Sequence, residues 1–501
     1  MPDPAASPID SGVTPWGGWF SSQPRGLSIL FFVELWERFS YYGMRALLVL
    51  FMVAPASEGG MGIATIEAAT LYGSYTMAVY MLSIPGGFIA DRITGARAAV
   101  LAGGGIIALG HYALAVPSAV SFYTGLILVA LGTGLFKPNI SVLVGALYAP
   151  GDERRDAGFS LFYMGINIGA FLAPLVTGFL AQSQWFKGWL AHNGLDPNTS
   201  WHWGFAAAGF GMTLALVTFA ANSQRFISIG GAPAIAPGTR SKVGGAIAGT
   251  AVLLALAMLS DHEGLQGLRW IFLILPLAAI IWFALRKDAD QRRLAAAGIF
   301  FIASMLFWAV FEQAGLTIAL FADKLTRNDV WGYSFPSSWF QSLNAFFVIA
   351  LSPVFAWAWT RLGARQPSSA MKFAIGLMFL AASFLLMVPA AQLTVEGRIS
   401  PLWLVGLFFL QTVGELFLSP VGLSLMTRLA PAGLTGLLLG AWFLSSAFGN
   451  KLAGVLGSSF DTKDPSALAE FFLHQGLFVL ASALLLVGLV PWVKRLMAGV
   501  R

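Results

Sequence analysis

Apolar runs of about 20 residues recur from Leu27 to the C-terminus of this 501-residue chain, separated by short polar or Gly- and Pro-containing breaks. A helix of that length spans about 30 Å, the thickness of the hydrocarbon core of a bilayer. Only 10% of the residues are charged, and 57% are hydrophobic. The chain therefore has too few polar groups to cover the surface of a soluble protein. The sequence therefore predicts a polytopic membrane protein surrounded by the lipid bilayer.

The runs are too long for the strands of a membrane barrel, and they lack the alternation of such strands. A helix satisfies all its backbone hydrogen bonds internally, as hydrocarbon requires. We therefore expect an all-α polytopic membrane protein whose apolar runs form helices and not strands. The fourteen expected helices lie near 27–55, 63–90, 96–116, 118–148, 157–183, 202–222, 242–262, 267–286, 294–321, 336–360, 369–390, 400–430, 433–457 and 467–497.

Lys and Arg residues are distributed unevenly over the expected loops. With the N-terminus inside, nineteen of the 29 fall in cytoplasmic segments and six in outer segments. The positive-inside rule then predicts a multi-pass protein of the cytoplasmic membrane with both termini cytoplasmic. The formal charge of +6 is explained by this distribution, so we expect no nucleic acid partner. Residues 1–24 contain no Lys or Arg, which argues against a secretion signal and predicts a disordered cytoplasmic tail over 1–26.

The chain divides into two blocks of six helices, residues 27–224 and 294–501, with an inserted helix pair in residues 225–293. The fourth helices of the two blocks carry loosely matching segments, LFKP at 135–138 and LFLSP at 416–420. Such a 6+6 arrangement is typical of transporters whose halves rock about a central site. Because the inserted pair lacks charge inside its apolar runs, we expect it to pack peripherally and to contribute no pocket residue.

Seven ionisable residues lie well inside the expected spans. If they faced lipid unpaired, they would together cost roughly 20 kcal/mol, so they must face one another or water. Structural ion pairs that hold the helices together are the alternative to a functional site. The seven residues are Glu34, Glu37, Arg38, Arg45, Lys137, Glu312 and Glu415.

The first helix carries the sharpest pattern. Glu34, Glu37, Arg38, Tyr41 and Arg45 fall within one stripe about 100° wide, opposite a face of Leu, Phe and Val. Burial and a neighbouring guanidinium shift the pKa of a carboxylate in opposite directions, which suits a group that takes up and releases protons. The five histidines lie nearer span ends or loops, so we expect carboxylates to carry the proton.

Lys137 and Glu415 are single charges of opposite sign in corresponding helices of the two blocks. One interpretation is that they hold the carboxylate and the amine of a zwitterionic ligand. The other is a plain salt bridge between helices.

Residues 34–43 (ELWERFSYYG) resemble the ExxERFxYYG motif of the proton-dependent oligopeptide transporter (POT/PTR) family, within the major facilitator superfamily. Ala345 departs from the family pattern, where a proline would follow Asn344. The resemblance covers almost the whole chain and implies the major facilitator fold, two six-helix bundles plus two additional helices between them. Further blocks follow in the family's order at 87–95 (GFIADRITG), 136–141 (FKPNIS), 162–169 (FYMGINIG), 311–313 (FEQ), 340–344 (FQSLN), 414–417 (GELF) and 442–444 (WFL).

The resemblance implies a symporter that imports di- and tripeptides across the cytoplasmic membrane by alternating access, driven by the proton gradient and without a cofactor. Glu34, Glu37 and Arg38 would carry the proton coupling. Arg45 and Glu312 would form an outer gate, and Glu312 is also a candidate for the proton path. Arg38 and Lys137 would meet the peptide carboxylate and Glu415 its amine. The implied substrate-binding residues are Arg38, Tyr41, Tyr42, Tyr80, Lys137, Asn167, Asn344, Glu415, Trp442 and Ser446.

Other functions stay open at this point. The same scaffold could carry another small substrate, such as nitrate, a drug or a modified amino acid. An intramembrane enzyme would need a nucleophile with a base or a metal cluster, and the chain has no Cys, no HExxH and no GxSxG. We therefore expect neither catalysis nor a bound metal. A channel is disfavoured by the 6+6 division and the off-centre charge cluster. The sequence leaves the oligomeric state open.

Overall fold

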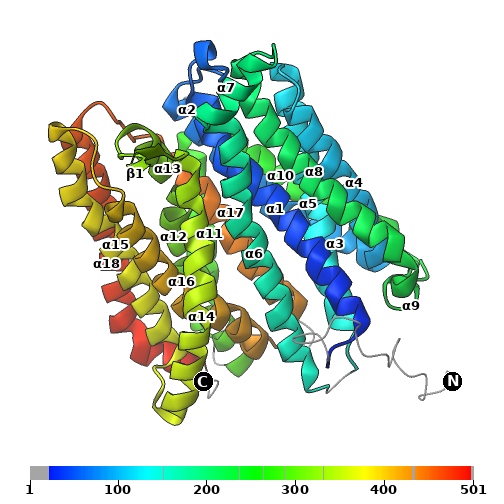
Figure 1. The fold of residues 1–501 in the computed structure, drawn as a ribbon. Coiled ribbons are helices and arrows are strands. Elements are labelled where there is room, and N and C mark those ends of the chain that lie inside the picture. Colours follow the sequence, from blue (N-terminus) through cyan, green and yellow to red (C-terminus); the bar gives the residue numbers. More distant parts are fainter. Residues whose placement is uncertain are drawn as a thin grey trace. The chain divides into compact units, whose positions relative to one another are not determined.

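The computed structural model describes residues 22–149, 152–235, 237–262, 264–286, 288–330, 332–431 and 435–497, most of them in helices (Figure 1). The expected N-terminal tail lies outside these residues as far as position 21. Packing divides the chain into two units, Met1–Leu47 with Met81–Val252, and Leu48–Tyr80 with Leu253–Arg501. The domain limits predicted above follow the order of helices along the chain and stay a prediction.

The first unit is built around four long helices that pack on one another, α4 (Ala96–Leu114), α5 (Ala119–Ala146), α6 (Arg154–Gln182) and α8 (Ser200–Asn222). It also holds most of α1 (Arg25–Val53), which continues into the second unit. The shorter helices α3 (Ser83–Ile89), α7 (Gln184–His192) and α9 (Ile227–Gly230) and the first part of α10 (Thr239–Leu259) complete it.

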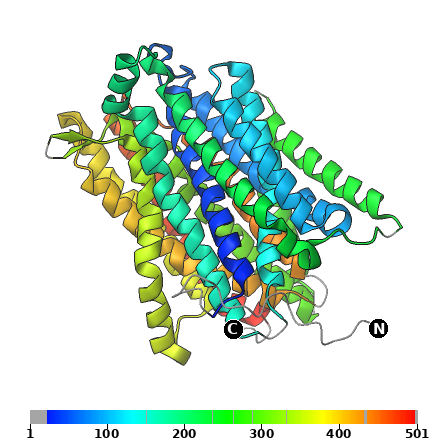
Figure 2. The same ribbon diagram turned by 45° about the vertical axis from the view of Figure 1, so that its right-hand side comes forward.

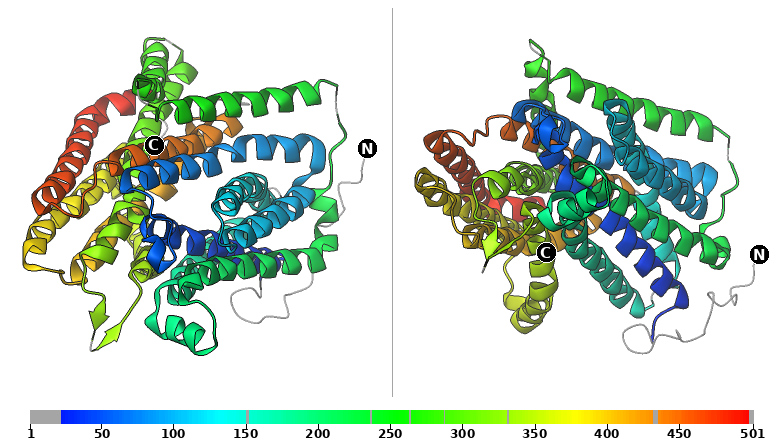
Figure 3. Two further views of the ribbon diagram at one scale, coloured as in Figure 1. Left: turned by 90° about the horizontal axis from the view of Figure 1, so that it is seen from above. Right: turned by 45° about the horizontal axis from the view of Figure 1, so that its top comes forward.

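The second unit contains α2 (Thr65–Met81), which packing groups with helices that follow it much later in the chain. Within this unit α15 (Ser369–Leu393) lies beside α16 (Leu402–Leu429) and α18 (Pro465–Leu496), and α12 (Ala289–Phe311) lies beside α17 (Thr435–Gly457) (Figure 3). An antiparallel hairpin of β1 (Asp329–Val330) and β2 (Tyr333–Ser334) follows α13 (Thr317–Lys324) (Figure 2). The other helices are α11 (Ile271–Ala284) and α14 (Ser342–Leu362).

Each of the fourteen predicted segments contains a helix, with three local corrections. The second segment is broken at Leu82, because Pro85 has no N–H with which to bond the carbonyl of the preceding turn. The ninth ends at Phe311 and continues as a 3-10 turn and α13. The short α7 and the β1–β2 hairpin, which lies between two of the predicted spans, were not predicted. The 3-10 turns are Ala56–Glu58, Pro197–Thr199, Ser223–Phe226, Gln266–Trp270, Glu312–Gly315, Ser337–Gln341, Gly363–Arg365 and Thr394–Glu396, and Ala90–Thr94 is a π-helical turn.

Ten helical segments among the described residues are long and apolar enough to cross a membrane, and the chain is a multi-pass membrane protein. The first helix is not among the ten, because Glu34, Glu37, Arg38 and Arg45 interrupt its apolar run. A helix with four charges can cross a bilayer only if those charges are shielded from lipid. The packing of α1 therefore decides where the polar groups of the first unit lie.

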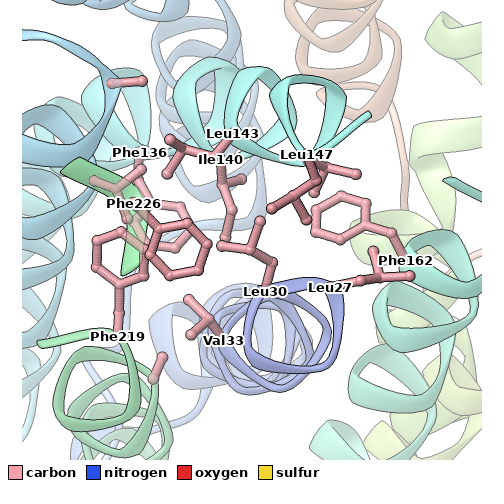
Figure 4. Packing of buried hydrophobic residues seen from close by; sticks show 14 of the residues in the cluster. Leu27, Leu30, Val33, Phe136, Ile140, Leu143, Leu147, Phe162, Phe219 and Phe226 are labelled. Carbon is pink, nitrogen blue, oxygen red and sulfur yellow. The ribbon is translucent and has the colours of Figure 1, made fainter. Parts of the chain in front are cut away.

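The apolar face of α1 packs into the core of the first unit (Figure 4). Leu30 and Val33 lie against a cluster that includes Phe136 and Ile140 of α5 and Phe219 of α8, all of them fully or almost fully buried. Since this face is held against its own unit, the residues on the opposite side of α1 form a separate polar stripe.

Within each unit, small residues bring neighbouring helices into close contact. A Cβ atom added to Gly103 of α4 would lie 2.7 Å from the carbonyl oxygen of Gly132 in α5. The same relation holds between Gly376 of α15 and Gly414 of α16, where the distance would be 2.8 Å. Without a hydrophobic force between helices in lipid, such backbone-to-backbone packing stabilises the bundle.

Candidate transport site

The polar stripe of α1 contains a buried three-residue ion cluster. The Nε atom of Arg38 lies 3.2 Å from Glu34 Oε1 and donates a hydrogen bond to Glu37 Oε2. Glu34, Glu37 and Arg38 are 3%, 1% and 3% exposed. Their spacing along the helix, predicted to place them on one face, brings them into direct contact.

The cluster keeps unused hydrogen-bonding capacity. Glu34 Oε2, Glu37 Oε1 and Arg38 Nη2 are buried without a hydrogen-bond partner within the part of the chain that the structure describes. Buried polar atoms of this kind are uncommon because leaving one unpaired costs about 1–3 kcal/mol. A proton and an anionic ligand are the two species that two carboxylate oxygens and a guanidinium N–H can bind.

Lys137 adds a second cation to this cluster. It lies in α5, is half-buried, and its charge acts on Glu34. With Arg38 and Lys137 charged and both glutamates ionised, the group is electrically balanced. If either glutamate takes up a proton, one positive charge remains in excess.

Two tyrosines support the arginines of α1. The guanidinium carbon of Arg38 lies 5.4 Å from the ring centre of Tyr41, and that of Arg45 lies 6.0 Å from the ring centre of Tyr42. The two rings contact each other edge to face at 5.4 Å. Both distances fall within the range of a cation–π interaction, so the rings restrain the arginine side chains as well as lining the stripe.

The FYMGINIG segment at 162–169 brings α6 onto the backbone of α1. A Cβ atom on Gly165 would lie 3.1 Å from the carbonyl oxygen of Phe31, and one on Gly169 would lie 2.3 Å from that of Leu35. The two glycines are four residues apart, so they form a single contact stripe next to Arg38. Asn167 lies between them and donates to the carbonyl of Tyr163 in its own helix, at 2.9 Å.

This contact gives a testable pair of variants. Gly169→Ala should cost about 1–3 kcal/mol of stability, because the new Cβ would displace α1 at the turn that carries Arg38. Gly105→Ala in α4 is the matched control, since a Cβ there meets nothing within 4 Å and should be neutral or stabilising by about 0.5–1 kcal/mol. Thermal unfolding in detergent measures both, and equal melting temperatures would contradict the assignment of Gly169.

A second polar cluster lies in the second unit, between α14 and α16. The amide nitrogen Nδ2 of Asn344 donates to Glu415 Oε2 at 2.9 Å and to Thr412 Oγ1 at 3.1 Å. The charge of Glu312 also acts on Glu415. This cluster is acidic and rich in oxygen acceptors, so it suits a cationic group with several N–H donors.

The remaining predicted binding residues are found on two helices. Trp442 of α17 is 5% exposed, and its ring lies so close to Gly422 of α16 that a Cβ there would be 2.0 Å away. Ser446 lies one turn further along α17, and its carbonyl accepts a hydrogen bond from Asn450. Tyr80 lies in α2 and is half-buried.

The structure thus gathers the predicted residues into two sets. Glu34, Glu37, Arg38, Lys137 and Tyr41 belong to the first unit, and Glu415, Asn344 and Glu312 to the second. The predicted gate pairs Arg45 of the first unit with Glu312 of the second, and it stays a prediction. No group of three or more His, Asp or Glu side chains that could hold a metal ion occurs among the described residues.

One ion pair with a buried lysine was missed by the sequence analysis. Lys451 of α17 is 4% exposed and donates to Asp261 Oδ2 and, at 2.9 Å, to Ser74 Oγ of α2. Asp261 lies in the turn that follows α10, at the connection between the two inserted helices. The expectation that this helix pair packs peripherally and contributes no pocket residue stays a prediction. The available signal was a lone lysine within the apolar segment 433–457. Thr412 was also missed, because nothing local distinguishes it from other threonines.

Comparison with known proteins shows which family the chain resembles. A family model described as PTR2, POT family, matches residues 97–471. The peptide transporter YePEPT of Yersinia enterocolitica is 38% identical over 97% of both chains. The di-/tripeptide transporter of Lactococcus lactis subsp. cremoris is 36% identical over 96% of this chain and 98% of its own.

The chain belongs to the POT family. The crystal structure of a mutant of peptide transporter POT in complex with alafosfalin is 40% identical and covers 97% of this chain and 98% of its own, with a TM-score of 0.84. The predicted membership of this family and the predicted major facilitator fold are both confirmed. POT proteins are transporters, which agrees with the prediction that the chain is not an enzyme.

Proposed function

We propose that this POT protein is a symporter that couples the entry of protons to the import of di- and tripeptides across the cytoplasmic membrane. The observation that carries the proposal is the buried cluster of Glu34, Glu37 and Arg38, on which the charge of Lys137 acts. The relatives named for peptide and di-/tripeptide transport support the choice of substrate.

Charge balance in this cluster provides the coupling. Two carboxylates and two cations cancel, so an added proton leaves one excess positive charge next to the polar stripe of α1. The carboxylate of a peptide compensates that charge, and each of the two ligands therefore strengthens the binding of the other. This reciprocity is what thermodynamic linkage requires of a symporter.

The two ends of the peptide are assigned to different units. Arg38 and Lys137 hold the carboxylate, while Glu415 and Asn344 hold the ammonium group. Tyr41, Tyr42, Tyr80, Asn167, Trp442 and Ser446 complete the substrate-binding residues of the proposal.

The transport cycle requires a defined orientation of the protein in the membrane and a gate. The distribution of Lys and Arg supports cytoplasmic N- and C-termini. Arg45 and Glu312 form the outer gate, and their interaction opens whenever the site faces outward. The proton gradient alone drives the cycle, and no cofactor takes part.

Liposomes that contain the purified protein test this function. A labelled dipeptide should accumulate when a pH gradient and a membrane potential are imposed. Unlabelled dipeptides whose carboxylate is esterified or whose amine is acetylated should compete at least about tenfold less well than the free dipeptide, because a charged hydrogen-bonding group is lost. Equal competition by free and blocked dipeptides would instead favour a different small substrate on the same scaffold.

A further inference from the structure

Thr412 occupies a position from which it can orient a neighbouring side chain. It is fully buried in α16, one turn before Glu415. Its hydroxyl donates to the carbonyl of Phe408 at 2.7 Å. A hydroxyl carries one hydrogen, so toward Asn344 the Thr412 oxygen can act only as an acceptor.

The amide of Asn344 is thereby fixed in one orientation. Both hydrogens of its Nδ2 are used, one toward Thr412 Oγ1 and one toward Glu415 Oε2. If the amide were turned over, its carbonyl oxygen would face the Thr412 oxygen with no hydrogen between them. Glu415 enforces this orientation only while it is ionised, because a protonated carboxyl can also donate. Thr412 enforces it whatever the protonation state of Glu415.

Two oxygen atoms remain for a ligand. Within the part of the chain that the structure describes, Asn344 Oδ1 and Glu415 Oε1 make no hydrogen bond. The charge of Glu312 acts on the same place and adds to its negative potential. A primary ammonium group has three N–H donors and so can satisfy both oxygens, whereas an acetylated amine has one.

We infer that Thr412 is a positioning residue, which holds the Asn344 carbonyl oxygen beside Glu415 as the second acceptor for the ammonium group of the substrate. This inference rests on the proposed function. If it is correct, Thr412 helps the protein to distinguish dipeptides with a free amine from those with an acetylated amine, although Thr412 itself does not contact the ligand.

The test compares Thr412→Val with Thr412→Ser in liposomes. Valine keeps the shape of threonine but loses the acceptor, and serine keeps the acceptor. The ratio between the competition constants of the N-acetylated and the free dipeptide should fall about two- to tenfold in Thr412→Val and return to the wild-type value in Thr412→Ser. The fall in this ratio should be largest at low pH, where Glu415 is protonated and can no longer hold the Asn344 amide in this orientation without Thr412.

The outcomes separate the two proposals. If the wild-type protein transports no dipeptide, the proposed function fails. If the wild type transports and Thr412→Val keeps its ratio, or if both competitors weaken in parallel, Thr412 is merely structural and the inference is overturned. Should Thr412→Val fail to fold in detergent, Thr412→Ala gives the same comparison with a smaller side chain.

Discussion

Replacing Glu37 by glutamine is expected to abolish the accumulation of peptide driven by a pH gradient, while exchange of peptide across the membrane continues in part. Glu37 is 1% exposed and accepts a hydrogen bond from Arg38. Glutamine has nearly the same shape and can still accept this bond, but it cannot take up a proton. One transported proton allows about a tenfold accumulation per pH unit, and the variant should fall to no accumulation.

Uptake of labelled dipeptide under an imposed pH gradient and counterflow without a gradient measure the two parts of this prediction. Glu67→Gln in α2 is the control, because Glu67 is an exposed carboxylate on the surface and should leave both rates unchanged. Accumulation at the wild-type level in Glu37→Gln would remove Glu37 from the proton path. Loss of counterflow as well would indicate a folding or binding defect.

Asp261→Asn should destabilise the protein by about 3–5 kcal/mol, because it leaves the buried ammonium of Lys451 without its carboxylate. Lys451→Met should have a comparable effect, since it leaves the carboxylate uncompensated. The double variant removes both charges and should be more stable than either single variant. Thermal unfolding in detergent measures all three.

The matched control is the exposed ion pair of Arg154 and Asp152, in which the arginine side chain is 52% exposed. Asp152→Asn should change stability by no more than about 1 kcal/mol, because the guanidinium group that it leaves behind is half exposed and solvated by water, whereas the ammonium group of Lys451 is buried. If the effects of Asp261→Asn and Lys451→Met simply add in the double variant, the two residues do not form a coupled pair.

The helices of this protein could be predicted from the sequence because hydrocarbon imposes one rule on every span. An apolar run of about 20 residues must form a helix there, whatever its local preferences. Outside such runs the rule gives no information, and there the predictions failed. The short helix α7 and the β1–β2 hairpin lie between the long apolar runs. The break at Leu82 was missed for another reason, because it depends on one proline inside an otherwise continuous run.

The candidate site was predictable where its residues share one helix. Glu34, Glu37 and Arg38 lie within five residues, so helical periodicity alone places them together. Asn344 is 71 residues from Glu415 and 68 from Thr412. Their contact depends on how α14 and α16 pack, which no local pattern encodes. A charge inside an apolar run pointed to Glu415, and the resemblance to the POT family supplied Asn344. Neither signal could find Thr412, whose role depends on its hydrogen bonds with Phe408 and Asn344.

The ion pair of Asp261 and Lys451 also constrains the order in which the helices assemble while the protein is being made. The two residues are 190 positions apart in the chain. At about 5–20 residues per second, a ribosome needs about 10–40 s to reach Lys451 after Asp261 has been made. During that interval the carboxylate of Asp261 must stay at a hydrated edge of the membrane. The inserted helix pair can therefore take its final position only after α17 has emerged, so its docking belongs to the last steps of assembly although its helices are made midway.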